Sequence, residues 1–158
     1  KLFLQHDAHW IPASSPGAGN ILIFNNGNRR PGGNASSVDE ITPPLSADGS
    51  YTRNAPEAFG PTSFAWTFQA NDFYAQNVSG AQRLLSGNTL ICDGPHGELF
   101  EVTPNGEVVW RYINPVVGSD IVAQGESIPT TNQGGQRTNS PGLNFVESFC
   151  CTIKYSCR

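Results

Sequence analysis

The sequence contains no methionine, and only 14% of its 158 residues are charged. Such low charge, together with 17 glycines and 12 prolines, is typical of a turn-rich β protein and argues against a helical one. No segment has convincing helical periodicity, and the longest apolar runs are far too short to cross a membrane. We therefore expect an all-β fold and no interaction with a membrane.

Positive charge is scarce as well. Lys and Arg total nine against 13 Asp and Glu, which gives a formal net charge of −4. The basic residues do not cluster beyond Arg29 and Arg30, whereas nucleic-acid-binding domains carry a basic patch. We therefore expect no nucleic-acid partner.

The four cysteines, Cys92, Cys150, Cys151 and Cys157, fit no zinc-binding spacing. We expect neither a metal ion nor a cofactor. Cys92 falls in an apolar predicted strand and is interpreted as a buried thiol. Pairing of Cys157 with Cys150 or with Cys151 is compatible with the sequence, and the spacing does not choose between them.

Neither an initiator methionine nor a signal peptide is visible, and the first four residues already have the composition of a strand. The interpretation is either a processed mature form or, preferably, a piece of a longer protein. Two sequons, at Asn34 and Asn77, are compatible with a secreted protein but also arise readily by chance.

What the sequence does contain is an ordered repetition of three short motifs. Residues 19–24 return at 87–92, residues 40–43 return at 101–104, and residues 64–68 return at 108–112. Each motif has the composition of a strand or of the turn that follows it. Repeats of this kind indicate units that bury an apolar face only by stacking on one another.

Each copy predicts four short strands. In the first copy they cover residues 2–11, 21–25, 38–42 and 64–69, and in the second copy residues 79–84, 89–92, 99–103 and 108–113. Four antiparallel strands in about 40 residues is the size of one propeller blade. The sequence thus predicts a partial β-propeller of four-stranded antiparallel blades, with blades at about 1–70 and 71–115. Residues 116–158 are expected to be irregular, with a partial third blade.

A comparison of the two copies singles out a polar pair. His6 and Asp7 align with Ser79 and Gly80 in the first strand, which in propellers usually lines the central channel. Packing does not require such a pair, and a histidine there can serve as general acid, base or nucleophile. The alternative is a structural, hydrogen-bonded histidine.

The turn at residues 25–30 is the second candidate. A glycine-relaxed turn that presents Arg30 suits an oxyanion, because a guanidinium binds sulfate, phosphate or carboxylate through two N–H groups. Asp7, Asn26 and Arg29 are added as candidate substrate-binding residues. The alternative is a hairpin turn with two solvated arginines.

Other prominent residues are interpreted as architectural. Glu40 and Glu101 occupy the same place in both copies, which favours a structural role for each. Trp10 is expected in the core, and His96, within a Gly-Pro-His-Gly turn, is expected to be a solvated loop residue.

Taken together, these motifs resemble the arylsulfotransferase-like β-propeller family. The resemblance covers about positions 2 to 115 and is carried by residues 5–8, 19–27 with Arg30, Ser37 and Glu40, 79–84, 87–91, 101–104 and 108–110. After residue 115 it ends. Bacterial members of the family are six-bladed periplasmic propellers that move a sulfuryl group between phenols through a sulfurylated histidine.

The resemblance implies a secreted or periplasmic aryl-sulfate sulfotransferase with a small phenolic or sulfate-ester ligand. His6 matches the histidine of the family's His-Asp-Ala motif, and Arg30, or alternatively Arg29, matches the arginine of its Asn-Gly turn. Arginine would neutralise the sulfuryl oxygens while histidine donates a proton to the leaving phenolic oxygen. No residue is assigned as the nucleophile, and two blades alone lack the remaining walls of an active site.

Two alternatives stay open. One is a non-catalytic secreted propeller module that binds a ligand or a partner through the long loops at residues 31–61. The other is a structural protein that associates with itself or other chains through open blade edges.

Overall fold

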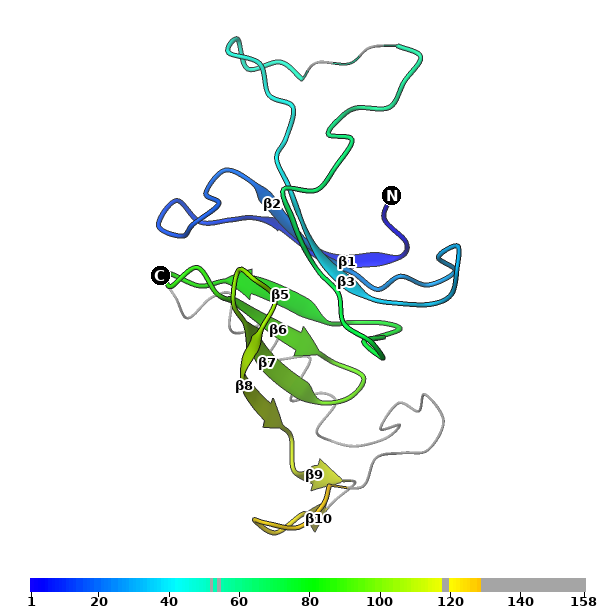
Figure 1. Ribbon diagram of the computed structural model, residues 1–158, viewed down its shortest axis with the longest axis vertical. Coiled ribbons are helices and arrows are strands. Elements are labelled where there is room, and N and C mark those ends of the chain that lie inside the picture. Colours follow the sequence, from blue (N-terminus) through cyan, green and yellow to red (C-terminus); the bar gives the residue numbers. More distant parts are fainter. Residues whose placement is uncertain (52, 54, 118–119, 129–158) are drawn as a thin grey trace.

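The computed structural model describes residues 1–51, 53, 55–117 and 120–128. This part of the chain is all-β and forms two four-stranded antiparallel sheets, with strand orders β1-β2-β3-β4 and β5-β6-β7-β8 (Figure 1). The predicted all-β class is confirmed. The sheets do not close into a ring, so the architecture observed is a pair of sheets.

The first sheet contains β1 (Gln5–Trp10), β2 (Ile21–Asn25), β3 (Ser37–Ile41) and β4 (Trp66–Phe68). The second contains β5 (Gly80–Arg83), β6 (Thr89–Asp93), β7 (Glu98–Val102) and β8 (Val108–Ile113). All eight lie where strands were expected, with ends that differ by a few residues. A short antiparallel pair, β9 (Val116–Val117) and β10 (Asp120–Ile121), follows them. The strand expected near the C-terminal end lies outside the described residues.

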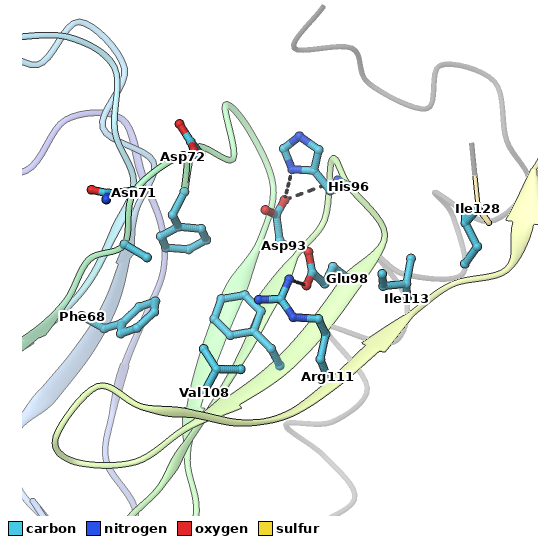
Figure 2. Close-up of a pocket in the computed structure, with 13 residues that line it drawn as sticks. Phe68, Asn71, Asp72, Asp93, His96, Glu98, Val108, Arg111, Ile113 and Ile128 are labelled. Atoms are coloured by element: carbon cyan, nitrogen blue, oxygen red, sulfur yellow. Dashed lines mark hydrogen bonds and ion pairs between the residues drawn. The ribbon is translucent and has the colours of Figure 1, made fainter. Parts of the chain in front are cut away.

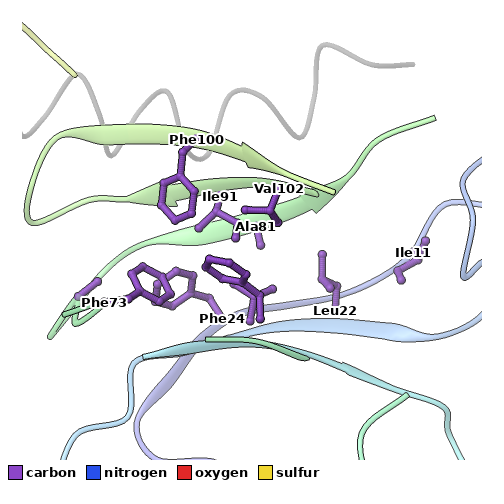
Figure 3. Close-up of a cluster of buried hydrophobic side chains, with 11 residues drawn as sticks. Ile11, Leu22, Phe24, Phe73, Ala81, Ile91, Phe100 and Val102 are labelled. Atoms are coloured by element: carbon purple, nitrogen blue, oxygen red, sulfur yellow. The ribbon is translucent and has the colours of Figure 1, made fainter. Parts of the chain in front are cut away.

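The hydrophobic core lies between the two sheets (Figure 3). It consists of Ile11, Leu22, Phe24, Val38, Phe68, Phe73, Ala75, Ala81, Ile91, Phe100 and Val102, with Trp66 packed against it. The rings of Phe24, Phe68 and Phe100 lie 5.7–5.9 Å from a neighbouring ring and are tilted or edge-on, which favours aromatic packing. One face of each sheet therefore buries the apolar residues that alternate along its strands.

The two sheets pair their strands in corresponding registers. Leu22 lies opposite Glu40 in the first sheet, and Leu90 lies opposite Glu101 in the second. An asparagine just before β2 donates to Glu40, with a distance of 2.5 Å from Asn20 Nδ2 to Glu40 Oε1. The equivalent distance from Asn88 Nδ2 to Glu101 Oε1 is 2.7 Å.

The connections of the two sheets differ. The segment between β3 and β4 projects away from both sheets (Figure 1) and contains an isolated bridge between Leu45 and Tyr51. In the second sheet, β7 and β8 are joined by a tight turn in which Gly106 N donates to Thr103 O at 2.9 Å. Within the described residues, no helix is long and apolar enough to cross a membrane.

Two expectations about buried residues were wrong. Trp10 is 56% exposed, because it pairs with Ile21 and so alternates away from the core residue Leu22. Cys92 is buried as expected but is disulfide-bonded rather than a thiol. The pairing expected among Cys150, Cys151 and Cys157 lies outside the described residues.

Candidate functional site

His6 and Asn26, both predicted as site residues, are in direct contact. His6 Nδ1 lies 2.6 Å from Asn26 Oδ1. The amide nitrogen of Asn26 donates to Ala75 O at 2.8 Å and to Val78 O at 3.1 Å, which orients its oxygen toward His6. His6 Nδ1 is therefore the donor, and Nε2 is the basic nitrogen of the neutral imidazole. His6 itself is exposed, whereas Asn26 is fully buried.

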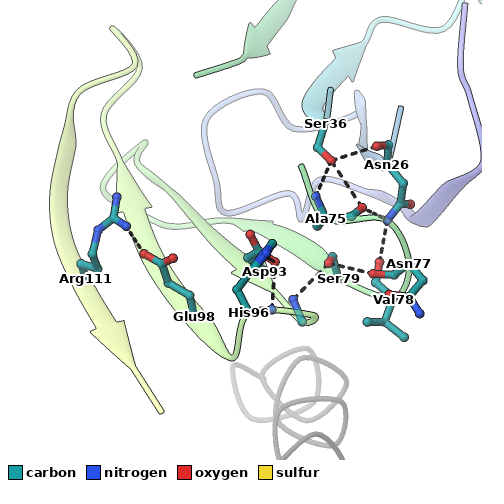
Figure 4. A network of polar contacts seen from close by, with 11 residues as sticks. Asn26, Ser36, Ala75, Asn77, Val78, Ser79, Asp93, His96, Glu98 and Arg111 are labelled. Atoms are coloured by element: carbon teal, nitrogen blue, oxygen red, sulfur yellow. Dashed lines mark hydrogen bonds and ion pairs between the residues drawn. The ribbon is translucent and has the colours of Figure 1, made fainter. Parts of the chain in front are cut away.

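A polar network holds the Asn26 turn against the segment that leads to β5 (Figure 4). Ser36 Oγ donates to Asn26 O at 2.9 Å and accepts a hydrogen bond from Ala75 N at 2.9 Å. Gly27 is required in this turn, because its φ is +74° and a Cβ there would lie 1.7 Å from Ala35 O. The turn that carries Asn26 is thus fixed by Ser36 and by backbone groups of the segment between β4 and β5.

Asp7 joins the two sheets. Its Oδ2 accepts a hydrogen bond from Ala81 N at 3.0 Å. A Cβ on Gly80 would lie 2.4 Å from that same oxygen, so only glycine leaves room for the carboxylate. Gly80 in the second copy and Asp7 in the first copy therefore contact each other. This gives Asp7 a structural role; substrate binding by Asp7 stays a prediction.

Arg30 lies in the loop between β2 and β3, apart from His6. Its Nη2 donates to Ser37 Oγ at 3.0 Å, and its guanidinium lies 5.9 Å from the centre of the Phe3 ring. Within the described residues, no carboxylate lies within 4.0 Å of the Arg30 guanidinium nitrogens. The adjacent Arg29 is exposed, and its backbone N–H donates to Asn34 Oδ1 at 2.8 Å.

Arg30 borders a cavity of about 250 Å³, hereafter the Arg30 cavity. Its lining consists of Lys1, Phe3, Asn25, Arg30, Ser37, Asp39, Phe64, Thr67 and Gln69. The Asp39 carboxylate in this lining accepts hydrogen bonds from Asn25 Nδ2 (3.0 Å), Ser37 Oγ (3.0 Å) and Thr67 Oγ1 (2.6 Å). Its acceptor capacity is therefore largely used by neighbours.

The structure thus separates the predicted set into three places. His6 and Asn26 meet at the end of β2, Asp7 contacts β5, and Arg30 opens onto its cavity. His6 is not among the residues that line the Arg30 cavity. A direct cooperation of His6 and Arg30 on one ligand stays a prediction.

A larger cavity, of about 380 Å³, lies between the end of β4 and the second sheet (Figure 2). Its lining combines the rings of Phe68, Phe73 and Phe100 with polar residues, among them Asp72, Asp93, His96, Glu98 and Arg111. His96 Nδ1 lies 2.8 Å from Asp93 Oδ1, and Arg111 pairs with Glu98. Burial raises the pKa of the Glu98 carboxyl above its ordinary value, although the Arg111 charge opposes this.

Sequence reasoning placed His96 correctly in a turn but missed its pairing with Asp93. The side chain of His96 is 42% exposed and that of Asp93 only 6%. The available signal was the spacing Asp93-Gly-Pro-His96, which lets the acid at the end of β6 reach back to the turn histidine.

Comparisons with known proteins identify no relative. No family model, no curated protein and no solved structure matches this chain. The resemblance to arylsulfotransferase-like propellers therefore depends on the quoted residues alone.

Proposed function

We propose that this chain is part of an arylsulfotransferase-like β-propeller and that its first blade binds the sulfuryl group of a small phenolic sulfate ester at Arg30. The observation that supports this most directly is the position of Arg30 beside a cavity, with no carboxylate within ion-pair distance in the described residues. An arginine in that setting offers N–H groups to an oxyanion.

The rest of the lining suits an aryl sulfate. Lys1 adds a second cationic side chain, while Phe3 and Phe64 add aromatic surface for a phenolic ring. Asp39 opposes an anion, but its carboxylate is occupied by three donors from the protein itself. The cavity, at about 250 Å³, suits a small ligand.

For the chain as it stands, we propose binding rather than turnover. Sulfuryl transfer requires an acid at the leaving phenolic oxygen and a cation at the sulfuryl oxygens of the same ligand. In the described contacts, His6 is engaged by Asn26 and Arg30 by Ser37. Transfer by His6 and Arg30 would need further blades that bring both residues to one ligand.

Binding is tested by titration calorimetry with 4-nitrophenyl sulfate. Arg30→Gln should raise the Kd at least tenfold, because it removes the charge-assisted contact, whereas Arg29→Gln should leave it unchanged. The two variants carry the same change in charge at adjacent positions. Equal affinity of the wild type and Arg30→Gln would end the proposal.

Transfer is tested separately, by the release of nitrophenol from the same ester in the presence of an acceptor phenol. We expect no turnover by this chain. Turnover that is lost in His6→Ala would instead establish the enzyme and place His6 in its mechanism.

A second function, partner binding, is favoured by the segment between β3 and β4. It carries Leu45, Tyr51 and Phe59, which are 59%, 49% and 56% exposed, and it projects from the sheets (Figure 1). Exposed apolar side chains gathered on a loop are typical of an interaction site. In this alternative, the chain is a non-catalytic or structural module, and replacement of these three residues by serine would abolish partner capture without affecting aryl sulfate binding.

We also propose a secreted or periplasmic location. The supporting observation is the disulfide at Cys92, since disulfides persist mainly in oxidising compartments. Resistance of Cys92 to alkylation in denaturant, without reduction, in protein taken from its native source is the test; a fully alkylated Cys92 would contradict it.

A further inference from the structure

The first sheet holds an arginine that comes from the second sheet. Arg83 Nη2 donates to Glu40 Oε2 at 2.6 Å, and its guanidinium lies 5.0 Å from the centre of the Trp66 ring. Both charged side chains are buried, Glu40 at 4% and Arg83 at 7% exposure. Glu40 and Trp66, on neighbouring strands, thus bind an arginine from the first strand of the next sheet, and we call this pair the first clasp.

The second sheet carries the same clasp on its other face. Glu101 lies opposite Trp110, as Glu40 lies opposite Trp66, and each glutamate accepts a hydrogen bond from an asparagine before the second strand. The Trp110 and Tyr112 rings are nearly parallel, 6.4 Å apart with an interplanar angle of 8°. We call Glu101, Trp110 and Tyr112 the second clasp.

The second clasp holds no arginine. In the described part of the chain, no cationic side chain lies within 4.0 Å of the Glu101 carboxylate. Trp110 is 48% exposed and Tyr112 is 39% exposed, and all six residues of β8 are exposed. The aromatic surface is therefore exposed, and the half-buried Glu101 carboxylate lies directly beside it.

We propose that the second clasp is a docking site for a partner polypeptide that presents an arginine from the first strand of an antiparallel sheet. The first clasp supplies the template, because the same residue pair in the same register already binds such a strand. Charge complementarity selects arginine, and the stacked rings provide a planar surface for its guanidinium.

A second copy of this chain does not fit the site. In its first sheet, Trp10 occupies the position that corresponds to Arg83, since Trp10 pairs with Ile21 as Arg83 pairs with Thr89. In its second sheet, Arg83 is already bound by Glu40. Among the described first strands of a second copy, neither of these two positions therefore offers a free arginine in the required register.

The probe for this site is a synthetic peptide with the sequence of residues 78–93, carrying Cys92→Ser and cyclised end to end so that the β5–β6 hairpin is retained. Titrated into the full chain, it should bind and shift the indole N–H resonance of Trp110. A matched peptide with Arg83→Gln should bind at least tenfold more weakly. Glu101→Gln in the full chain should have the same effect, and the two changes together should weaken binding little further, because they remove the same contact.

Glu107→Gln is the matched control, because Glu107 is an exposed acid in the turn before β8 and its loss changes the net charge equally. This variant should bind the peptide like the wild type. Trp110→Ala, at an exposed position, provides a second disruption if Glu101→Gln fails to fold. Equal binding of the two peptides, or binding of neither, would overturn the proposal. So would self-association of the chain that Glu101→Gln abolishes, because the occupant would then be a second copy.

Discussion

The two sheets share strand order and register but differ in what covers them. On β4, the last strand of the first sheet, Phe68 is buried in the core between the sheets and Trp66 packs against that core. The strand β8 of the second sheet is exposed along its whole length. The same local pattern therefore forms core in one sheet and an accessible surface in the other, which shows that burial here is decided by the neighbouring sheet rather than by the strand.

One turn of each sheet shows a similar difference in whether it is held by a segment outside its own sheet. The turn at Asn26 and Gly27 in the first sheet is fixed by hydrogen bonds to the segment that leads into the second sheet. The turn at Gly106 in the second sheet is closed by its own backbone. Polar residues near the first turn are thus tied to the contact between the sheets, and variants at paired positions can separate the two contributions.

The largest expected effect is at the two glutamates. Glu40→Gln leaves the buried Arg83 without its countercharge and should lower the free energy of unfolding by about 3–5 kcal/mol. Glu101→Gln, with no cation to lose in the described residues, should change it by less than about 0.5 kcal/mol. Denaturant unfolding measures both values. Equal losses would mean that the two clasps are not differently occupied.

The next largest difference in stability is expected between variants of Leu22 and Leu90, which lie opposite Glu40 and Glu101 in the two sheets. Leu22→Ala should cost about 2–5 kcal/mol, because it leaves a cavity in the fully buried core between the sheets. Leu90→Ala, at the equivalent but only partly buried position, should cost less than Leu22→Ala. Thermal and denaturant unfolding of both variants provide the comparison, and a larger loss at Leu90 would contradict the assignment of the core.

A smaller contrast is expected at two turn glycines. Gly106→Ala forces a side chain into a φ of +84° with no close neighbour, which should cost about 1–2 kcal/mol. Gly27→Ala has a similar φ of +74° but would also place its Cβ against Ala35 O. It should therefore cost more than Gly106→Ala in the same unfolding measurement. Equal costs would indicate that the turn at Gly27 relaxes without resistance.

Sequence reasoning succeeded where the signal is local. Apolar segments bounded by Gly-Asn and Pro-Asn-Gly turns located the four strands of the second sheet, and the repeated motifs then located the four strands of the first sheet. The matched positions of Glu40 and Glu101 favoured a structural role, which the buried ion pair with Arg83 supports for Glu40, and both glutamates accept a hydrogen bond from a neighbouring asparagine. Local patterning is sufficient for such predictions because strands and turns depend on nearby residues.

It failed where two distant segments meet. The fit of Asp7 against Gly80 depends on how the sheets pack, which strand periodicity does not specify. The cavity near His96 is likewise made by residues from both sheets. For the candidate site, the sequence predicted that His6 and Asn26 belong to one site, but it did not predict that their side chains are in contact.

The smallest effect concerns pH and has opposite signs in the two sheets. Burial lowers the pKa of His9 on β1 below its ordinary value of 6.5, outweighing the Asp7 carboxylate 3.4 Å away. Burial raises the pKa of Glu98 on β7 above 4.5. Below pH 6.5 the unfolded state binds more protons at His9 than the folded state does, so stability is lost as pH falls through the folded pKa.

At Glu98 the folded state binds more protons, so stability is present below pH 4.5 and is lost as pH rises from 4.5 through the raised folded pKa. His9→Gln should therefore remove a loss of stability on acidification, and Glu98→Gln should remove a loss on raising the pH. Denaturant unfolding in small pH steps gives the two slopes relative to the wild type. A glutamine at either position does not titrate. If the slope of unfolding free energy against pH is unchanged in His9→Gln, burial does not disfavour the charged imidazole. An unchanged slope in Glu98→Gln would show the same for the Glu98 carboxylate.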